Sequence, residues 1–334
     1  MMKALRRTQG GLLGLCLQCL LVVAAPQAGA QRPAIPVVAM LCPESCAVGW
    51  TESEPVGSMF LRGLRARGHV DGKTLILDTR GAGVAYGRLP HYAEQLVRQK
   101  SAAILAEGWA ATEAARRATT TIPVIMVGVP DAERGLLQSL ARPGGNVTGL
   151  TYPYESLATK QLELLRETVP RAVRIGILIN PANPEHEKVL PAVEAAARAA
   201  AVELVKVEVR QRADFARAID SLKGAGVGAA LVLGDQLLYS GELLLHALNH
   251  RLPTISLKPS FVEAGGLMSY GPSPLEMAER VAFYVDRVLG GAPPGSLPAE
   301  QPTRFELVIN VTTAKALGIA LPQSVLLRAN RLVR

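Results

Sequence analysis

Short apolar runs alternate with amphipathic segments along most of the chain. Nearly continuous apolar stretches such as 36–41 and 174–179 are typical of strands buried on both faces. Segments such as 56–67 repeat apolar residues at helical spacing. We expect strands at 36–41, 74–77, 102–105, 123–127, 147–151, 174–179, 202–209, 228–233, 253–257 and 267–270. We expect helices at 56–67, 89–100, 110–119, 135–140, 160–168, 189–200, 213–222, 242–249 and 275–289. This alternation predicts an α/β protein with parallel sheets.

The strand–helix order occurs twice. A glycine- and proline-containing break at 141–149 ends the first series, and the same order then starts again. Paired glycines and a Gly-Pro step bound the short strand 267–270, which is either a connector or an ordinary edge strand. The pattern predicts two Rossmann-like lobes joined by hinge crossings near 144–151 and 265–272. Lobe 1 is expected to hold 31–148 plus 271–300, and lobe 2 to hold 149–270 plus 301–334.

The C-terminal part is expected to return to both lobes. The helix 275–289 should pack on lobe 1. The apolar segment 305–311 is either a third crossing or an added strand, and 321–329 is expected to be an edge segment.

The N-terminus has the features of a secretory signal peptide. Three basic residues precede an apolar run at 11–25, and Ala28-Gly29-Ala30 supplies a small-x-small cleavage pattern. We expect residues 1–30 to be removed and the mature protein to be periplasmic; an uncleaved anchor is the alternative. The apolar run is shorter than the roughly 20 residues of a spanning helix. Cys16 and Cys19 lack the preceding small residues of a lipid-attachment box, so no lipid anchor is expected.

The mature chain keeps two cysteines, Cys42 and Cys46. In an oxidising compartment they form either a local disulfide or two free thiols. No metal site is expected, because the histidines are scattered at 69, 91, 186, 246 and 250. No cofactor is expected either, because the chain has only one weak dinucleotide-binding motif.

Charge and aromatic content argue against a nucleic-acid partner. Loss of the signal peptide removes three positive charges and no negative ones, so the net charge falls from +8 to +5. The basic residues are mixed with glutamates, and aromatic residues make up only 4% of the chain.

Ligands of doubly wound sheets bind beyond the carboxyl ends of the strands. These ends fall at 42–46, 80–87, 107–112 and 129–133 in lobe 1, and at 180–186, 210–214, 234–240 and 258–260 in lobe 2. The candidate ligand-binding residues are Glu44, Ser45, Glu107, Gly108, Trp109, Ala110, Asp131, Tyr154, Asn180 and Asp235. Two lobes facing each other through these loops would close on a small molecule.

Each candidate has a structural alternative. The N–H groups of Gly108 to Ala110 open a helix and would hold a carboxylate, and Trp109 either stacks on a ligand ring or packs in the loop. Asp131 and Asp235 either bind an ammonium group or cap helices. Asn180 either binds ligand or shapes a proline-rich turn.

Enzyme signatures are weak or missing in this sequence. Gly81 and Gly83 resemble part of a dinucleotide-binding loop, but the spacing to Gly87 is wrong by one residue. The sequence contains no nucleophile-elbow, P-loop or H-E-x-x-H motif. We therefore expect a binding protein and not an enzyme.

Several long motifs resemble one family. L-A-R-P-G-G-N-V-T-G-L (140–150), N-P-A-N-P (180–184), F-V-E-A-G-G-L-M-S-Y-G-P (261–272) and Q-P-T-R-F-E-L-V-I-N-V-T-T-A-K-A-L-G (301–318) are similar to ABC-transporter substrate-binding proteins of the TrpX-like, tryptophan- and tyrosine-binding group. The segment 60–75 also fits this group. The resemblance covers nearly all of the mature chain. It implies a type I periplasmic-binding fold and delivery of ligand to an inner-membrane permease.

The sequence departs from the family where specificity is set. Members commonly carry G-G-T-P-A where this chain has E-G-W-A-A at 107–111, and G-D-P where it has V-P-D at 129–131. These departures predict a pocket in which Trp109 selects a smaller or differently shaped ligand.

The function expected from the sequence is a periplasmic solute-binding protein of an ABC importer. It is expected to act as a monomer that closes its lobes on an amino acid or related solute and then docks on the permease. The alternatives are a secreted enzyme or a ligand-sensing partner of a membrane receptor on the same scaffold.

Overall fold

The computed structural model describes residues 35–43, 46, 51, 55–83, 85–130 and 135–334. The predicted signal peptide and the candidate residues Glu44, Ser45 and Asp131 lie outside this part of the chain. No helix within the described residues is both long and apolar enough to span a bilayer.

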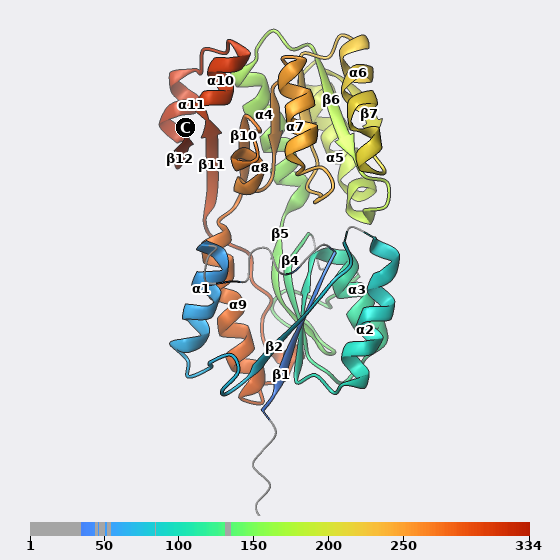
Figure 1. The fold of residues 1–334 in the computed structure, drawn as a ribbon, viewed down its shortest axis with the longest axis vertical. Helices are drawn as coiled ribbons and strands as arrows, with labels where there is room; N and C mark the ends of the chain where they lie inside the picture. Colours follow the sequence, from blue (N-terminus) through green and yellow to red (C-terminus); the bar gives the residue numbers. More distant parts are fainter. Residues whose placement is uncertain (1–34, 44–45, 47–50, 52–54, 84, 131–134) are drawn as a thin grey trace, which may run out of the picture. The chain divides into compact units, whose positions relative to one another are not determined.

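The first sheet has five parallel strands in the order β2-β1-β3-β4-β5 (Figure 1). Its strands are β1 (Val37–Cys42), β2 (Ile76–Gly81), β3 (Ala103–Glu107), β4 (Val124–Pro130) and β5 (Val147–Tyr152). Its helices are α1 (Pro55–Arg65), α2 (Leu89–Arg98), which follows the 3-10 turn Tyr86–Arg88, α3 (Gly108–Ala118) and α9 (Pro274–Leu289). Apolar side chains of α2 and α3 pack on one face, while α1 and α9 share the other. Both faces are covered, which explains the nearly unbroken apolar runs of the inner strands.

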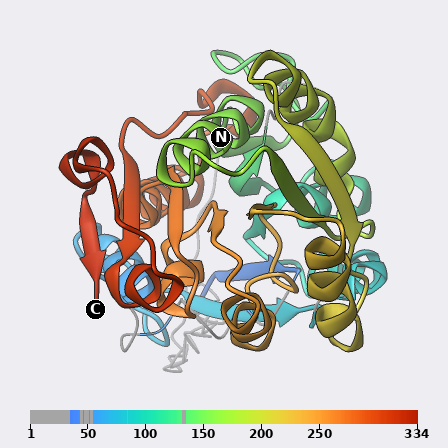
Figure 2. The same ribbon diagram turned by 90° about the horizontal axis from the view of Figure 1, so that it is seen from above.

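The second sheet has seven strands in the order β12-β11-β10-β9-β8-β6-β7, with β12 and β7 at its two edges (Figures 1 and 2). Its strands are β6 (Arg174–Ile179), β7 (Glu203–Glu208), β8 (Ala229–Val232), β9 (Thr254–Ser256), β10 (Met268–Pro272), β11 (Phe305–Asn310) and β12 (Arg331–Val333). Every pairing is parallel except that of β10 with β11. Its helices are α4 (Tyr154–Thr168), α5 (Pro184–Ala199), α6 (Phe215–Gly224), α7 (Gly241–Asn249), α8 (Pro259–Glu263), α10 (Val311–Leu317) and α11 (Gln323–Arg328), with a short 3-10 turn at Arg212–Asp214. A further 3-10 turn, Pro294–Ser296, lies beside the first sheet, where Gly144 N donates to Gly295 O at 3.2 Å. The predicted α/β class with two parallel-dominated sheets is confirmed.

Three local predictions were wrong. Residues 135–140 form turns and bends instead of a helix, because Gly135 has a φ of +123° and Gln138 N donates to Pro143 O at 2.8 Å. Residues 323–328 form α11, and the edge strand β12 comes directly after it. The short helices α8 and α10 were missed, because five and seven residues are too few to reveal a helical period. Of the two readings of 305–311, the structure contains the added strand, β11.

The chain passes between the sheets after β5, after β10 and before β11, and hydrogen bonds tie these segments together. Thr151 N donates to Glu300 O, and Glu300 N donates to Gly149 O, both at 2.9 Å. Ser273 N donates to Arg304 O at 2.9 Å. The backbone groups at the points where the chain passes from one sheet to the other are therefore hydrogen-bonded.

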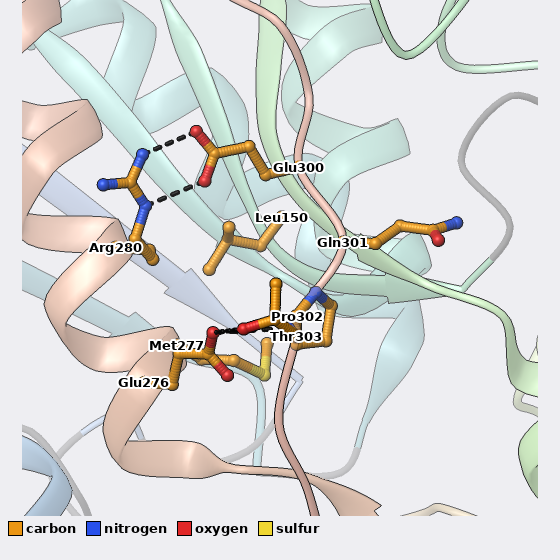
Figure 3. A pocket seen from close by; sticks show the side chains of 8 residues that line it. All are labelled: Leu150, Glu276, Met277, Arg280, Glu300, Gln301, Pro302 and Thr303. Atoms are coloured by element: carbon orange, nitrogen blue, oxygen red, sulfur yellow. Dashed lines mark hydrogen bonds and ion pairs between the residues drawn. The ribbon is translucent and has the colours of Figure 1, made fainter.

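Two side chains of α9 hold the third of these segments (Figure 3). The Glu276 carboxylate accepts from Thr303 Oγ1 at 2.6 Å and from Arg304 N at 2.9 Å. Arg280 makes two hydrogen bonds to Glu300, at 2.8 and 2.5 Å. Leu150, Met277 and Pro302 complete a cavity of about 180 Å³ beside these contacts. The carboxylate and the guanidinium therefore fix the course of 300–304 against α9.

Candidate functional site

The carboxyl ends of the strands bring several predicted residues into contact. Glu107 ends β3 and is followed by the first turn of α3, while Asn180 and Asp235 follow β6 and β8. Side chains from these loops of the first sheet touch side chains from the loops of the second in three places. The sequence prediction named one partner of each contact, Asp235, Glu107 and Trp109, although the role of these residues as ligand-binding groups remains a prediction.

Asp235 is the most highly coordinated of these side chains. It is 4% exposed, and its Oδ1 accepts from Asn180 Nδ2 at 3.2 Å and from Leu237 N at 2.9 Å. Its Oδ2 accepts from Asn183 Nδ2 at 3.0 Å and from Tyr86 Oη at 2.7 Å. The carboxylate is therefore supplied with four donors, which is what a buried charge requires.

Asn180 and Asn183 shape the turn that presents their amides to Asp235. Asn180 Oδ1 accepts from Ala182 N at 3.0 Å, and Asn183 Oδ1 accepts from Glu185 N at 3.1 Å at the start of α5. The structural alternative proposed for Asn180 thus holds, and the same side chain also binds Asp235. Local amide hydrogen bonds of this kind fix a turn around prolines.

His186 also stabilises the turn at Asn180 and Asn183. It was not among the residues predicted from the sequence. It is fully buried, and its Nδ1 accepts from Asn180 N at 2.8 Å. The proton of the neutral ring is then on Nε2, which lies 3.4 Å from Gly234 O. Burial lowers the pKa of His186 below its ordinary value, although the nearby Asp235 charge acts in the opposite direction. A second ring proton would remove the acceptor of Asn180 N.

Tyr154 reaches the loop after β8 from α4. Its Oη accepts from Gly234 N at 2.6 Å, and its ring lies edge-on to Tyr152 at 5.9 Å between centroids. Burial raises the pKa of Tyr154 well above its ordinary value, so its hydroxyl stays protonated. Tyr154 therefore fixes the position of Gly234, next to Asp235.

The second contact between the two sets of loops is an ion pair. Lys258 Nζ lies 3.0 Å from Glu107 Oε1, with the two side chains 41% and 29% exposed. Gly108, with a φ of +71°, follows Glu107 and turns the chain into α3, where Thr112 Oγ1 donates to Gly108 O at 2.8 Å. A non-glycine residue at Gly108 would be strained, so this turn depends on glycine.

The third contact involves Trp109. The ammonium of Lys188 lies 3.2 Å from the centroid of the Trp109 ring, and the same ammonium pairs with Glu185 at 3.0 Å. One face of the ring is therefore covered by a cation from the second sheet. Trp109 and Ala110 also pack against the apolar cluster under α3. In this arrangement, packing of Trp109 in its loop is compatible with a role for Trp109 in ligand binding.

Four contributing residues were missed by sequence reasoning: Tyr86, His186, Lys188 and Lys258. Three of them lie within the loops expected at strand ends, but no local pattern distinguishes a contacting side chain from its neighbours there. Lys188 belongs to the first turns of α5, which begins five residues before the predicted start of that helix.

Cys42, the last residue of β1, is joined to Cys46 by a disulfide with α-carbons 5.5 Å apart. Both cysteines are 3% exposed. Among the described residues, no group of three or more His, Cys, Asp or Glu side chains is arranged to hold a metal ion.

Comparison with known proteins identifies the family of this chain. The profile of the ABC transporter substrate binding protein family matches residues 56–333. The chain belongs to this family. A tyrosine-binding protein of Clostridioides difficile (strain R20291) is 29% identical over 263 residues, which are 78% of this chain and 75% of that relative. The family is one of substrate-binding proteins and not of enzymes.

Solved structures share the family fold. A conserved domain protein from Vibrio cholerae O1 biovar El Tor strain N16961 is 27% identical, with a TM-score of 0.80 over 89% of this chain and 99% of its own. An ABC domain from Streptococcus pneumonia in complex with L-Trp is 23% identical, with a TM-score of 0.80 over the same shares of the two chains, 89% and 99%. The resemblance stated from sequence motifs is confirmed.

Proposed function

We propose that this chain is the substrate-binding component of an ABC importer, which closes on an amino acid or a closely related zwitterion. The observation that carries the proposal is the meeting of opposite charges from the two sheets, Glu107 and Lys258, at the carboxyl ends of the strands. This edge is where open α/β sheets bind ligands. Membership of a substrate-binding family supports the same function.

The Glu107–Lys258 pair indicates the charge of the ligand. A zwitterion that replaces their direct 3.0 Å contact would bind its carboxylate to Lys258 and its ammonium to Glu107, so neither charge would be left unpaired on desolvation. The named relative is a tyrosine-binding protein, and a protein of the same fold holds L-Trp. We propose that Trp109, with Lys188 on one ring face, leaves its remaining surface to the ligand side chain.

Export and delivery complete the proposal. Removal of residues 1–30 would release the mature protein into the periplasm, and the ligand-bound form would dock on the permease as a monomer. Glu44, Ser45 and Asp131 remain predicted ligand contacts.

The test begins with native mass spectrometry of the purified mature protein, followed by thermal shift with L-tyrosine, L-tryptophan and smaller L-amino acids. A ligand at 100 times its dissociation constant stabilises the folded state by about 2.7 kcal/mol. We expect Glu107→Gln and Lys258→Met to abolish most of the shift. Lys160→Met removes a comparable exposed pair, with Glu163 at 2.7 Å on α4, and should leave the shift unchanged.

Two outcomes would contradict the proposal. One is an absence of stabilisation by every amino acid together with stabilisation by solutes of another class. The other is chemical turnover of a bound compound, which would indicate an enzyme.

A further inference from the structure

Asp235 and Tyr86 meet in a hydrogen bond between the loops of the two sheets. We infer that this bond is a latch: it stabilises the arrangement in which the loops touch, and Asp235 acts on ligand affinity only by holding Tyr86. The inference rests on the proposed closure around a solute. It assigns positioning residues for that closure and replaces the prediction that Asp235 receives a ligand ammonium.

The position of the Asp235 carboxylate is fixed by loops of the second sheet, without a contribution from Tyr86. Three of its four donors, Asn180 Nδ2, Asn183 Nδ2 and Leu237 N, come from the loops after β6 and β8. These loops are fixed in turn by His186 and Tyr154. The acceptor is therefore oriented without any contribution from the first sheet, and closure does not have to order it.

Tyr86 supplies the fourth bond and is the only donor to Asp235 from the first sheet among the described residues. A carboxylate has about four lone-pair positions. With two donors on each oxygen, these positions are filled, and no acceptor is left for a ligand ammonium while the latch is made. Glu107, which pairs with Lys258 at 3.0 Å, is instead the carboxylate to which the proposed function assigns the ligand ammonium.

The latch should outweigh the Glu107–Lys258 contact between the loops. A hydrogen bond to a charged, buried group changes an equilibrium constant by about 10- to 100-fold. The Glu107–Lys258 pair is partly exposed, and such pairs contribute about fivefold or less. The latch needs no ligand, so it should populate the closed arrangement in the free protein, and it should raise affinity because ligand binds that arrangement.

The first experiment uses the ligand-free mature protein. Tyr86→Phe removes only the hydroxyl, and Tyr92→Phe is the matched control on α2, where the ring contacts His91. Small-angle X-ray scattering should give a larger radius of gyration for Tyr86→Phe than for the wild type and Tyr92→Phe, with unchanged circular dichroism. Equal radii for all three proteins would overturn the inference. This measurement does not depend on the identity of the ligand.

The second experiment is a double-mutant cycle with Tyr86→Phe and Asp235→Asn, read as the dissociation constant of whichever amino acid gives the largest thermal shift. If Asp235 acts through the latch, Asp235→Asn should weaken binding at least tenfold in the wild type and less than threefold in the Tyr86→Phe background. An equal loss in both backgrounds would show that Asp235 affects ligand binding independently of Tyr86, either directly or through its own loops, and would overturn the inference while leaving the proposed function intact.

Discussion

Gly271 lies where β10 approaches the backbone after β9, and replacing it tests how closely the second sheet is packed. A β-carbon built on Gly271 would lie 2.2 Å from Leu257 O and 3.0 Å from Leu257 Cδ1. The first of these atoms belongs to the backbone, so no side-chain rotation relieves the overlap. The next residue, Pro272, ends β10 immediately before the chain leaves the sheet toward α9.

Relief of the overlap requires the two chain segments to separate by about 1 Å, which is the kind of backbone shift that costs about 1–3 kcal/mol in packed interiors. Because the overlap is with a backbone carbonyl, we expect Gly271→Ala to reach the upper value. A loss of about 3 kcal/mol corresponds to a decrease of roughly 6 °C in melting temperature for a chain of this size.

The assay is urea unfolding followed by circular dichroism, with Gly224→Ala as the control. Gly224 is the last residue of α6, and a β-carbon there meets no atom within 4 Å. Alanine should be neutral or stabilise by up to about 1 kcal/mol at such a position. The reasoning is refuted if the free energies of unfolding of Gly271→Ala and Gly224→Ala differ by less than about 1 kcal/mol, which is on the order of one packing defect.

Two further predictions concern the loops at the strand ends. The disulfide between Cys42 and Cys46 closes a short loop, and chain entropy assigns such a closure about 2 kcal/mol. The double variant Cys42→Ser/Cys46→Ser should lose that amount in non-reducing urea unfolding, and an unchanged midpoint would contradict the expectation. His186 has a folded-state pKa below its unfolded value, so its contribution is fully present above about pH 6.5 and is lost as the pH falls from there toward the folded pKa. His186→Gln should flatten the stability profile in this window, the exposed His91→Gln should not, and equal profiles for the two variants would refute the assignment.

The alternation of elements could be predicted because both sheets are covered on two faces, which leaves nearly continuous apolar strands such as β6. Boundaries were less predictable where contacts distant in sequence decide them. Helix α4 begins at Tyr154, six residues before its predicted start, because Tyr154 and Leu157 are buried against the second sheet. The strand predicted at 74–77 begins instead at Ile76, because residues 70–75 form a local turn held by Thr74 Oγ1.

The candidate site was harder to predict from the sequence than the fold. Strand-end loops follow from topology, so Glu107, Asn180 and Asp235 were found among them. Their partners were not, because Tyr86 lies 149 positions from Asp235, and Lys258 lies 151 positions from Glu107. A single sequence carries no signal for such pairs. The burial of His186 likewise depends on packing that its neighbours in sequence do not determine.

The placement of α9 has a consequence for how the polypeptide matures. The five strands of the first sheet are all synthesised by Tyr152, yet Val281 and Tyr284, which cover one face of that sheet, come more than a hundred residues later. Until they emerge, that face is covered only in part, by α1 residues such as Phe60 and Leu64, so the first half cannot complete its core before the second half is made. Under the export proposed above, such a chain would reach the membrane before its first half has completed folding, which would suit passage through a narrow export channel.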